Sequence, residues 1–213
     1  MSDTHLTSKF NKKKFDALKR IFESSDQIIF NGDLWENAII NFDQFVDSEW
    51  KRLFRLMKSK KTVYIHGNHD REIDVDDRAY KFCDKLVSGD YRFKSGKINY
   101  LVKHGHEDSK ISGLVYKILG DNPKLVHWLT YPADPPQKLH EFLVTKFGKG
   151  PLNFMNNNLK NKRRPKGEYL ITSHTHSPEI DHKKRYINTG FTNFGFISYI
   201  EITDKPRLIK TSY

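Results

Sequence analysis

Two short apolar runs in the first third of the chain, residues 27–30 and 62–65, each end at a polar loop. Continuous apolar runs of this length predict buried strands. Residues 12–24 and 35–58 instead carry apolar side chains at helical spacing, which predicts amphipathic helices. The first part of the chain is therefore expected to alternate helices with strands.

The remainder of the chain outside residues 109–166 is rich in strand patterns. The predicted strands there are 91–94, 98–103, 169–172, 186–187, 196–202 and 208–210. An alternation of strands and helices that finishes in consecutive strands is typical of mixed sheets with flanking helices. We expect an α/β fold in the form of a layered sandwich.

Residues 109–166 interrupt this rhythm and are interpreted as a basic helical cap, inserted into a core of residues 1–108 and 167–213. Apolar side chains recur at helical spacing from Ile111 to Leu119, and again at Leu139, Phe142, Leu143 and Phe147. The segment holds nine Lys and two Arg against three acidic residues, so it carries eight of the chain's eleven net positive charges. Such a charge concentration predicts an anionic ligand, whether nucleic acid, nucleotide or lipid head group.

Composition places the 213-residue chain among globular proteins of a reducing compartment. Its single cysteine, Cys83, cannot close an intrachain disulfide. Neither a signal segment nor an apolar run long enough to span a bilayer is present. We expect a cytoplasmic protein, with peripheral membrane contact through the cap as an additional expectation.

Five short runs of metal-ligating residue types occur in a fixed order along the chain. They are Asp3-Thr4-His5, Gly32-Asp33, Gly67-Asn68-His69-Asp70, His104-Gly105-His106 and His174-Thr175-His176. Together they offer carboxylate, amide and imidazole donors for two divalent cations. A two-metal centre promotes in-line displacement at phosphorus, so these runs indicate a phosphoester hydrolase.

The order of the five runs resembles the calcineurin-like metallophosphoesterase superfamily, whose pattern is D-x-H, G-D, G-N-H-[DE], a lone H and G-H-x-H. The match extends from Asp3 to His176, and Ser173 stands where that family usually has glycine. The resemblance implies a four-layer α-β-β-α sandwich of two mixed sheets. The family also has a strand before D-x-H, where only Met1 and Ser2 stand here. Either the true start lies upstream or the sheet has a gap.

The resemblance also implies a role for each matching residue. One cation would be bound by Asp3, His5, Asp33 and His176, and the other by Asp33, Asn68, His104 and His174. Asp33 would bridge the two cations, and a hydroxide between them would be the nucleophile. His69 would stabilise the phosphoryl oxygens or protonate the leaving group, with Asp70 orienting it. The donor types favour Mn²⁺, with Fe, Zn or Co as alternatives.

The length of the segment between His104 and His174 favours one branch of that superfamily. Pyrophosphohydrolases that cleave UDP-2,3-diacylglucosamine carry a helical cap at this point, although the best-known ones have Arg where His69 stands. We expect Lys160, Lys162, Arg163 and Arg164 in the cap to contact the anionic substrate. A nuclease or phosphodiesterase acting on DNA, RNA or small nucleotides is the main alternative. A non-catalytic scaffold of the same fold is a less favoured one.

Overall fold

The computed structural model describes residues 1–108, 134–161 and 167–213. Its helices are α1 (Lys12–Glu23), α2 (Phe42–Asp47), α3 (Phe54–Ser59), α6 (Asp134–Phe147) and α7 (Met155–Lys160). Short 3-10 helices are η1 (Glu49–Leu53), η2 (Glu72–Asp74), η3 (Asp77–Lys81), η4 (His106–Asp108) and η6 (Pro151–Phe154). Within the described ranges no helix is both long and apolar enough to cross a membrane.

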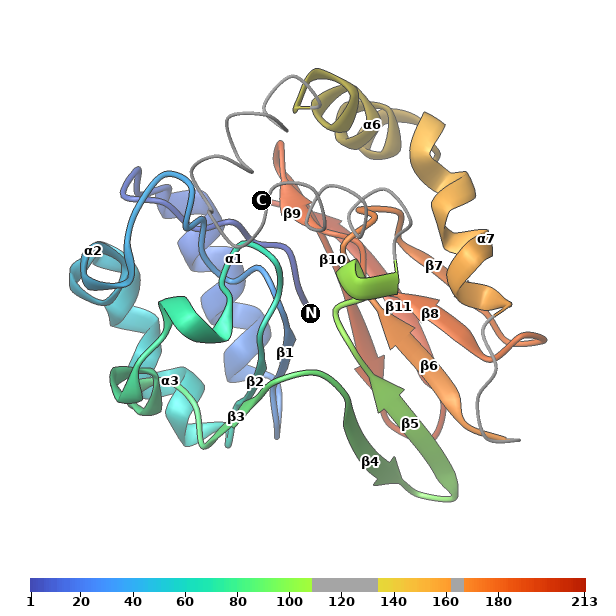
Figure 1. The fold of residues 1–213 in the computed structure, drawn as a ribbon, viewed down its shortest axis with the longest axis horizontal. Coiled ribbons are helices and arrows are strands. Elements are labelled where there is room, and N and C mark those ends of the chain that lie inside the picture. Colours follow the sequence, from blue (N-terminus) through green and yellow to red (C-terminus); the bar gives the residue numbers. More distant parts are fainter. Residues whose placement is uncertain (109–133, 162–166) are drawn as a thin grey trace.

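The strands form three sheets (Figure 1). A parallel sheet has the order β1 (Ile29–Asn31), β2 (Val63–Ile65), β3 (Lys85–Val87). An antiparallel sheet has the order β11 (Pro206–Ser212), β10 (Phe196–Ile202), β9 (Thr192–Asn193). A mixed sheet has the order β4 (Tyr91–Ser95), β5 (Ile98–Val102), β6 (Tyr169–Thr172), β8 (Tyr186–Asn188), β7 (Glu179–Asp181).

Alternation along the strands divides the apolar side chains between separate layers. On β2, Tyr64 packs with the helices α1, α2 and α3, while Val63 and Ile65 face the mixed sheet. On β5, Tyr100 and Val102 face the parallel sheet. Leu101 packs instead with Leu159 of α7 on the outer face. This period-two division gives the layers helix, sheet, sheet and helix, so the predicted α/β sandwich is confirmed.

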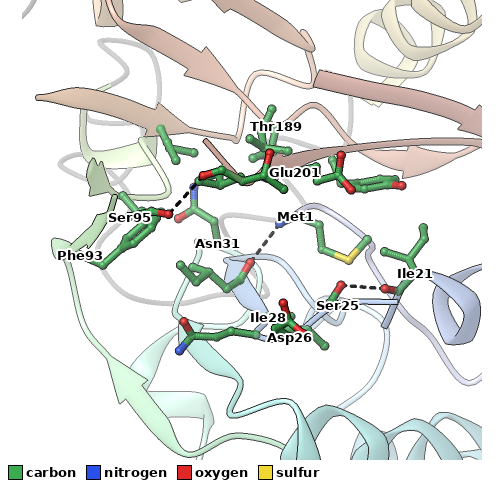
Figure 2. Close-up of a pocket in the computed structure, with 18 of the residues that line it drawn as sticks. Met1, Ile21, Ser25, Asp26, Ile28, Asn31, Phe93, Ser95, Thr189 and Glu201 are labelled. Atoms are coloured by element: carbon green, nitrogen blue, oxygen red, sulfur yellow. Dashed lines mark hydrogen bonds between the residues drawn. The ribbon is translucent and has the colours of Figure 1, made fainter. Parts of the chain in front are cut away.

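The expectation of two mixed sheets needs one correction, because the helix-covered layer consists of two separate sheets. Residues Met1–Asp3 lie between them and bond to both sides: Asp3 N–H donates to Gly32 O at 3.1 Å, and Thr192 N–H donates to Asp3 O at 3.0 Å. Beyond Met1, a cavity of about 340 Å³ separates β1 from β10 (Figure 2). The extended segment Met1–Asp3 therefore joins the two sheets along part of their length.

The helix predicted over 35–58 also differs in the structure. It is divided into α2, η1 and α3; α2 and η1 each begin at a capping side chain, and α3 continues directly from η1. Asn41 accepts from Gln44 N–H, and Ser48 accepts from Trp50 N–H with an extended backbone. Capping side chains of this kind start new helices, so apolar spacing alone overestimated the helix length.

Candidate metal centre and active site

The predicted ligand residues gather in loops at the carboxyl ends of strands. Asp33 follows β1, Asn68 follows β2, and His104 follows β5. His174 and His176 follow β6, and the N-terminal segment beside β1 supplies Asp3 and His5. Loops at the carboxyl ends of strands are held in place by the sheets, so five distant runs of sequence form one site.

Five of the seven predicted ligands have a left-handed backbone. Their φ angles are 49° for Asp3, 42° for His5, 55° for Asp33, 67° for His174 and 50° for His176. This region costs a non-glycine residue about 1–2 kcal/mol. Backbone strain of this kind persists where the surrounding structure overdetermines it, and it clusters at functional sites.

Two motif glycines permit this packing because no side chain fits in their place. A Cβ atom on Gly32, whose φ is 79°, would lie 2.3 Å from His104 Nδ1. A Cβ atom on Gly67 would lie 2.1 Å from Asp33 Oδ1 and 2.7 Å from Asp33 N. Gly32 and Gly67 are therefore required because His104 and Asp33 approach the backbone so closely.

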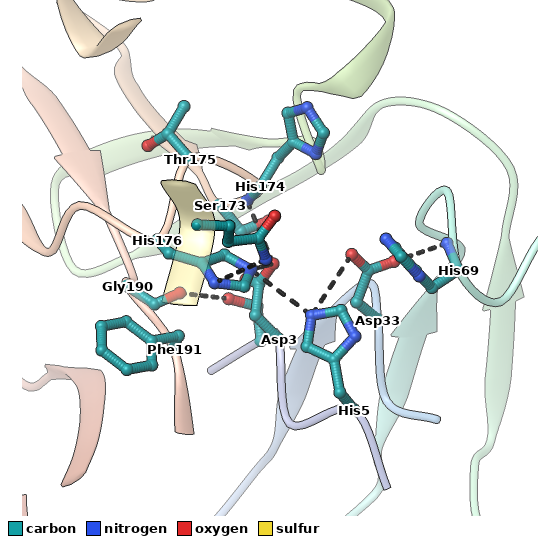
Figure 3. A network of polar contacts seen from close by, with 12 residues as sticks. Asp3, His5, Asp33, His69, Ser173, His174, Thr175, His176, Gly190 and Phe191 are labelled. Atoms are coloured by element: carbon teal, nitrogen blue, oxygen red, sulfur yellow. Dashed lines mark hydrogen bonds and ion pairs between the residues drawn. The ribbon is translucent and has the colours of Figure 1, made fainter. Parts of the chain in front are cut away.

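The first donor group consists of Asp3, His5 and His176 (Figure 3). His176 Nε2 lies 3.1 Å from Asp3 Oδ1, and His5 Nε2 lies 3.4 Å from His176 Nε2. Asp3 Oδ2 is buried and has no hydrogen-bond partner among the described residues. A buried carboxylate oxygen without a partner beside two facing imidazole nitrogens fits a bound cation.

The second donor group consists of Asp33, His104 and His174, with Asn68 beside them. His104 Nε2 lies 3.1 Å from Asp33 Oδ2 and 3.0 Å from Asn68 Oδ1. His174 Nδ1 also lies 3.0 Å from Asn68 Oδ1. Asp33 Oδ2 is 3.9 Å from His5 Nε2, which places this carboxylate between the two groups.

The spacing within both groups fits divalent cations. Donors at about 2.1 Å from one cation stand about 3.0 Å apart at the edge of an octahedron and about 3.4 Å apart at the edge of a tetrahedron. The donor pairs above are separated by 3.0 to 3.4 Å. The predicted ligands are therefore assembled in a form able to hold metal.

Glu36, which lies outside the predicted site residues, contacts two of the site histidines. Its Oε2 lies 2.8 Å from His5 Nδ1, and its Oε1 lies 2.7 Å from His69 Nδ1. Burial disfavours the charged form of His69, yet Glu36 and Asp33 raise its pKa to about 10. Burial likewise opposes ionisation of Glu36, but the two histidines hold the pKa of this carboxyl well below its usual range. The contact with Glu36 therefore favours the protonated ring of His69 and holds it in one orientation.

Asp70, which was expected to orient His69, has another set of contacts. Its carboxylate accepts from the backbone N–H groups of Asp33, Leu34 and Gly67 at 3.0, 2.6 and 2.7 Å. Burial, together with the nearby Asp33 carboxylate, raises the pKa of Asp70 to about 7. In the structure Asp70 fixes the backbone of the two ligand loops, and the ring contact to His69 is made by Glu36.

Ser173, which replaces the family's usual glycine, bonds within the site. Its hydroxyl lies 2.8 Å from Asn31 O and 2.9 Å from His104 Nδ1. The same His104 nitrogen is 2.9 Å from Asn31 O. With Nδ1 engaged in this way, His104 presents Nε2 to Asp33 and Asn68. The serine is therefore accommodated without disturbing the ligand loop.

The basic residues predicted to bind substrate are described only in part. Lys160 forms an ion pair with Glu179 and lies 5.7 Å from the centre of the Tyr186 ring. Lys162, Arg163 and Arg164 lie outside the described residues, as does the predicted apolar helix from Ile111 to Leu119. Lys160 is the last residue of α7, and its ammonium group pairs with a carboxylate of the same protein.

Asn156 of α7 braces the loop that carries His174 and His176. Its Oδ1 accepts from Thr175 Oγ1 at 2.7 Å, and its Nδ2 donates to Ser177 O at 2.9 Å. The side chain is fully buried. Asn156 is not among the predicted site residues, and its burial had no signal in a run of three asparagines.

A sequence profile described as calcineurin-like phosphoesterase matches residues 1–178. The chain belongs to this family. As a member, it is a metal-dependent hydrolase of phosphoester bonds, as the order of its ligand runs predicted. No curated protein sequence matches the chain.

Several solved structures resemble the fold. An archaeal phosphodiesterase has 14% identity and a TM-score of 0.48, over 99% of this chain and 96% of that one. The phosphoesterase Yfce from E. coli has 12% identity and a TM-score of 0.45, over 99% and 96%. A double mutant of Vps29 from Entamoeba histolytica has 12% identity and a TM-score of 0.43, over 100% and 97%. Structural similarity at this level of sequence identity and TM-score gives no information about the substrate.

Proposed function

We propose that the chain hydrolyses a phosphodiester or pyrophosphate bond at a centre of two divalent cations. Asp3, His5, Asp33 and His176 would hold one cation, and Asp33, Asn68, His104 and His174 the other. The observation that supports two cations is the position of Asp33, which lies between both donor groups. Cations bound there supply charge neutralisation of the phosphoryl group and a nucleophilic water at neutral pH.

His69 is proposed to donate a proton to the oxygen of the leaving group. Glu36 and Asp33 raise its pKa to about 10, which favours the protonated ring, and Glu36 Oε1 lies 2.7 Å from Nδ1. The other ring nitrogen, Nε2, is then the donor that faces substrate. A charged imidazole also stabilises the negative charge that develops on the phosphoryl oxygens.

The proposed metal is Mn²⁺, because the donor set combines imidazoles with carboxylate and amide oxygens. Metal analysis of the purified protein tests the centre directly. Two cations per chain support the proposal, one cation refutes the bridging role of Asp33, and none would favour the scaffold alternative.

For the substrate we propose a nucleotide-linked lipid such as UDP-2,3-diacylglucosamine. The insertion combines a basic segment with apolar side chains, and Leu139, Phe142, Phe147 and Phe154 are exposed on its described part. Such a mixture suits a ligand that has both a diphosphate and acyl chains. Membrane contact through the insertion and a cytoplasmic location belong to the same proposal.

A substrate panel with Mn²⁺ separates the alternatives. It compares a generic phosphodiester, UDP-2,3-diacylglucosamine, dinucleotide polyphosphates, and single- and double-stranded DNA. A kcat/KM for the lipid nucleotide far above that for the others supports the proposal. Preference for DNA, with binding that weakens steeply as salt rises, would replace it with the nuclease.

A variant with Lys160, Lys162, Arg163 and Arg164 neutralised sharpens the comparison. Its KM for the lipid nucleotide should rise while hydrolysis of the generic diester stays near the wild-type rate, since a small diester needs only the metal centre. An unchanged KM for every substrate in the panel would remove the basic segment from substrate recognition.

A further inference from the structure

One described helix of the insertion, α6, turns polar side chains toward the site. Gln137, His140, Glu141 and Val144 stand at positions i, i+3, i+4 and i+7, which share one face of a helix. His140, Glu141 and Val144 are buried, whereas Leu139, Phe142 and Phe147 are exposed. The buried polar face indicates that the helix has partners within the metal centre.

The contacts of α6 hold it against the loop that follows β6. Val144 packs in one cluster with Phe191 and Phe196. His140 Nε2 lies 3.0 Å from Ser177 Oγ, and its Nδ1 accepts from Leu152 N–H at 3.1 Å. Gly150 allows this approach, because a Cβ atom there would lie 2.2 Å from His140 Nδ1. An apolar contact at Val144 and hydrogen bonds at His140 therefore both hold α6 in place.

Glu141 reaches the predicted ligand His176 from this face. Its Oε1 is hydrogen-bonded to His176 Nδ1, and its Oε2 accepts from Asn193 Nδ2 at 2.8 Å. The Glu141 side chain is almost completely buried. One face of the His176 imidazole stacks on Phe191, with ring centres 5.5 Å apart and an interplanar angle of 15°. Nδ1 of His176 points to the insertion and Nε2 points to Asp3.

We propose that Glu141 is a positioning residue which ties the insertion to the Asp3–His5–His176 half of the metal centre. A carboxylate on Nδ1 holds the proton there, so it fixes the tautomer with a free lone pair on Nε2 and makes that nitrogen a stronger donor. The inference rests on the proposed metal centre. It adds that one cation site, but not the other, depends on a residue of the inserted segment.

Only one of the two cation sites is expected to depend on Glu141, because Glu141 contacts only one of the two donor groups. Among the described residues, the contacts of Glu141 are to His176, Asn193 and Gln137, and none is to the Asp33–His104–His174 group. His104 is oriented independently, by Asn31 O and Ser173 Oγ. Loss of Glu141 should therefore weaken one cation site by roughly ten- to a hundredfold, the usual scale for removing the partner of a ligating histidine.

Mn²⁺ titration of the metal-free full chain by calorimetry, with two-site analysis, tests this inference. Glu141→Gln keeps one acceptor oxygen and should weaken one of two sites several-fold, while Glu141→Ala should weaken the same site by at least tenfold. Gln137 Nε2 lies 3.2 Å from His176 Nδ1, and rotation of this amide would bring its oxygen to Nδ1 as a substitute acceptor. The double variant Gln137→Ala/Glu141→Ala is therefore measured as well.

Glu179→Gln is the matched control, because Glu179 is another carboxylate that contacts the insertion, through Asn156 and Lys160. This variant loosens the insertion without touching His176, so both Mn²⁺ affinities should stay within about twofold of wild type. Equal weakening in Glu179→Gln and Glu141→Ala would overturn the inference, since general loosening of the insertion would then explain it.

The proton on His176 Nδ1 gives a second measurement that does not need metal. Asp3 and Glu141 face the two ring nitrogens, so the metal-free ring is expected to carry a proton on each. In ¹⁵N-labelled metal-free protein, the Nδ1 proton should give a downfield signal that Glu141 protects from solvent exchange, and the double variant should lose this signal. The signal should persist in Glu179→Gln. If wild type binds no Mn²⁺, the proposed function fails while the Nδ1 signal still reports on Glu141. If wild type binds two Mn²⁺ and the double variant keeps both affinities and the Nδ1 signal, the inference about Glu141 fails alone.

Discussion

Replacement of Glu36 should separate proton donation from metal binding. The carboxylate uses one oxygen for each histidine, Oε2 for His5 and Oε1 for His69. Glutamine has a single acceptor oxygen, and its amide nitrogen is a donor. In Glu36→Gln, therefore, one ring keeps an acceptor and the N–H of the other ring faces a second donor. Glu36→Ala deprives both rings of their acceptor.

The size of each effect follows from the kind of bond that is lost. A hydrogen bond to a charged group contributes about 1.5–3 kcal/mol. At about 1.4 kcal/mol for each factor of ten, the loss of one such bond amounts to roughly ten- to a hundredfold. For His69 the loss should lower kcat, because the proton donor is no longer held in place. For His5 it should lower the affinity of one cation, because the ligand loses the partner of its other nitrogen.

The assay measures kcat and KM on a generic phosphodiester at saturating Mn²⁺, together with a Mn²⁺ titration. Glu36→Ala should show both losses, and Glu36→Gln mainly one of them. Glu23→Gln serves as the control, because the Glu23 side chain pairs with Lys19 on the exposed surface of α1. A Glu36→Ala enzyme that keeps kcat and both Mn²⁺ affinities within about twofold of wild type would refute this account of Glu36.

Three further predictions concern single positions. Asp33→Asn should abolish hydrolysis and reduce bound metal, since it removes the charge shared by both donor groups; retention of two cations and near-normal turnover would contradict the bridge. His69→Ala should retain both cations and lower kcat by roughly a hundredfold or more; loss of metal, measured by elemental analysis, would instead make His69 a ligand. Gly67→Ala should lower the free energy of unfolding by about 1–3 kcal/mol, the usual range for overpacking, because its Cβ would meet Asp33 N at 2.7 Å. Thermal unfolding checks this last value, and an unchanged Tm would show that the loop adjusts.

The ligand loops were predictable because each depends on local sequence. A short apolar run makes a strand, and before Asp33 and Asn68 a glycine follows the strand and allows the close approach of the ligand loops. The strands before Asp33, Asn68, His104 and His174 are all present. The residue types and their order then indicated metal and phosphoester chemistry, and the family match agrees with that conclusion.

The helix faces were less predictable, because helical periodicity does not state which side meets the core. On α6 the apolar residues Leu139, Phe142 and Phe147 recur at helical spacing, yet they are exposed. The buried face carries His140 and Glu141, which the strand-end loop beside them can satisfy with hydrogen bonds. A polar side chain can be buried where the tertiary structure supplies its partner.

The sequence by itself determined the strands that precede the ligand loops, the loops themselves and the class of chemistry, since these depend on neighbouring residues and on residue type. Only the tertiary structure decided which side chains orient the ligands. Glu36 lies 33 residues before His69, and Glu141 lies 35 residues before His176. Asp70, the immediate neighbour of His69, bonds to backbone groups instead. Orientation of a histidine depends on which carboxylate reaches its free nitrogen in space, and adjacency along the chain does not fix that.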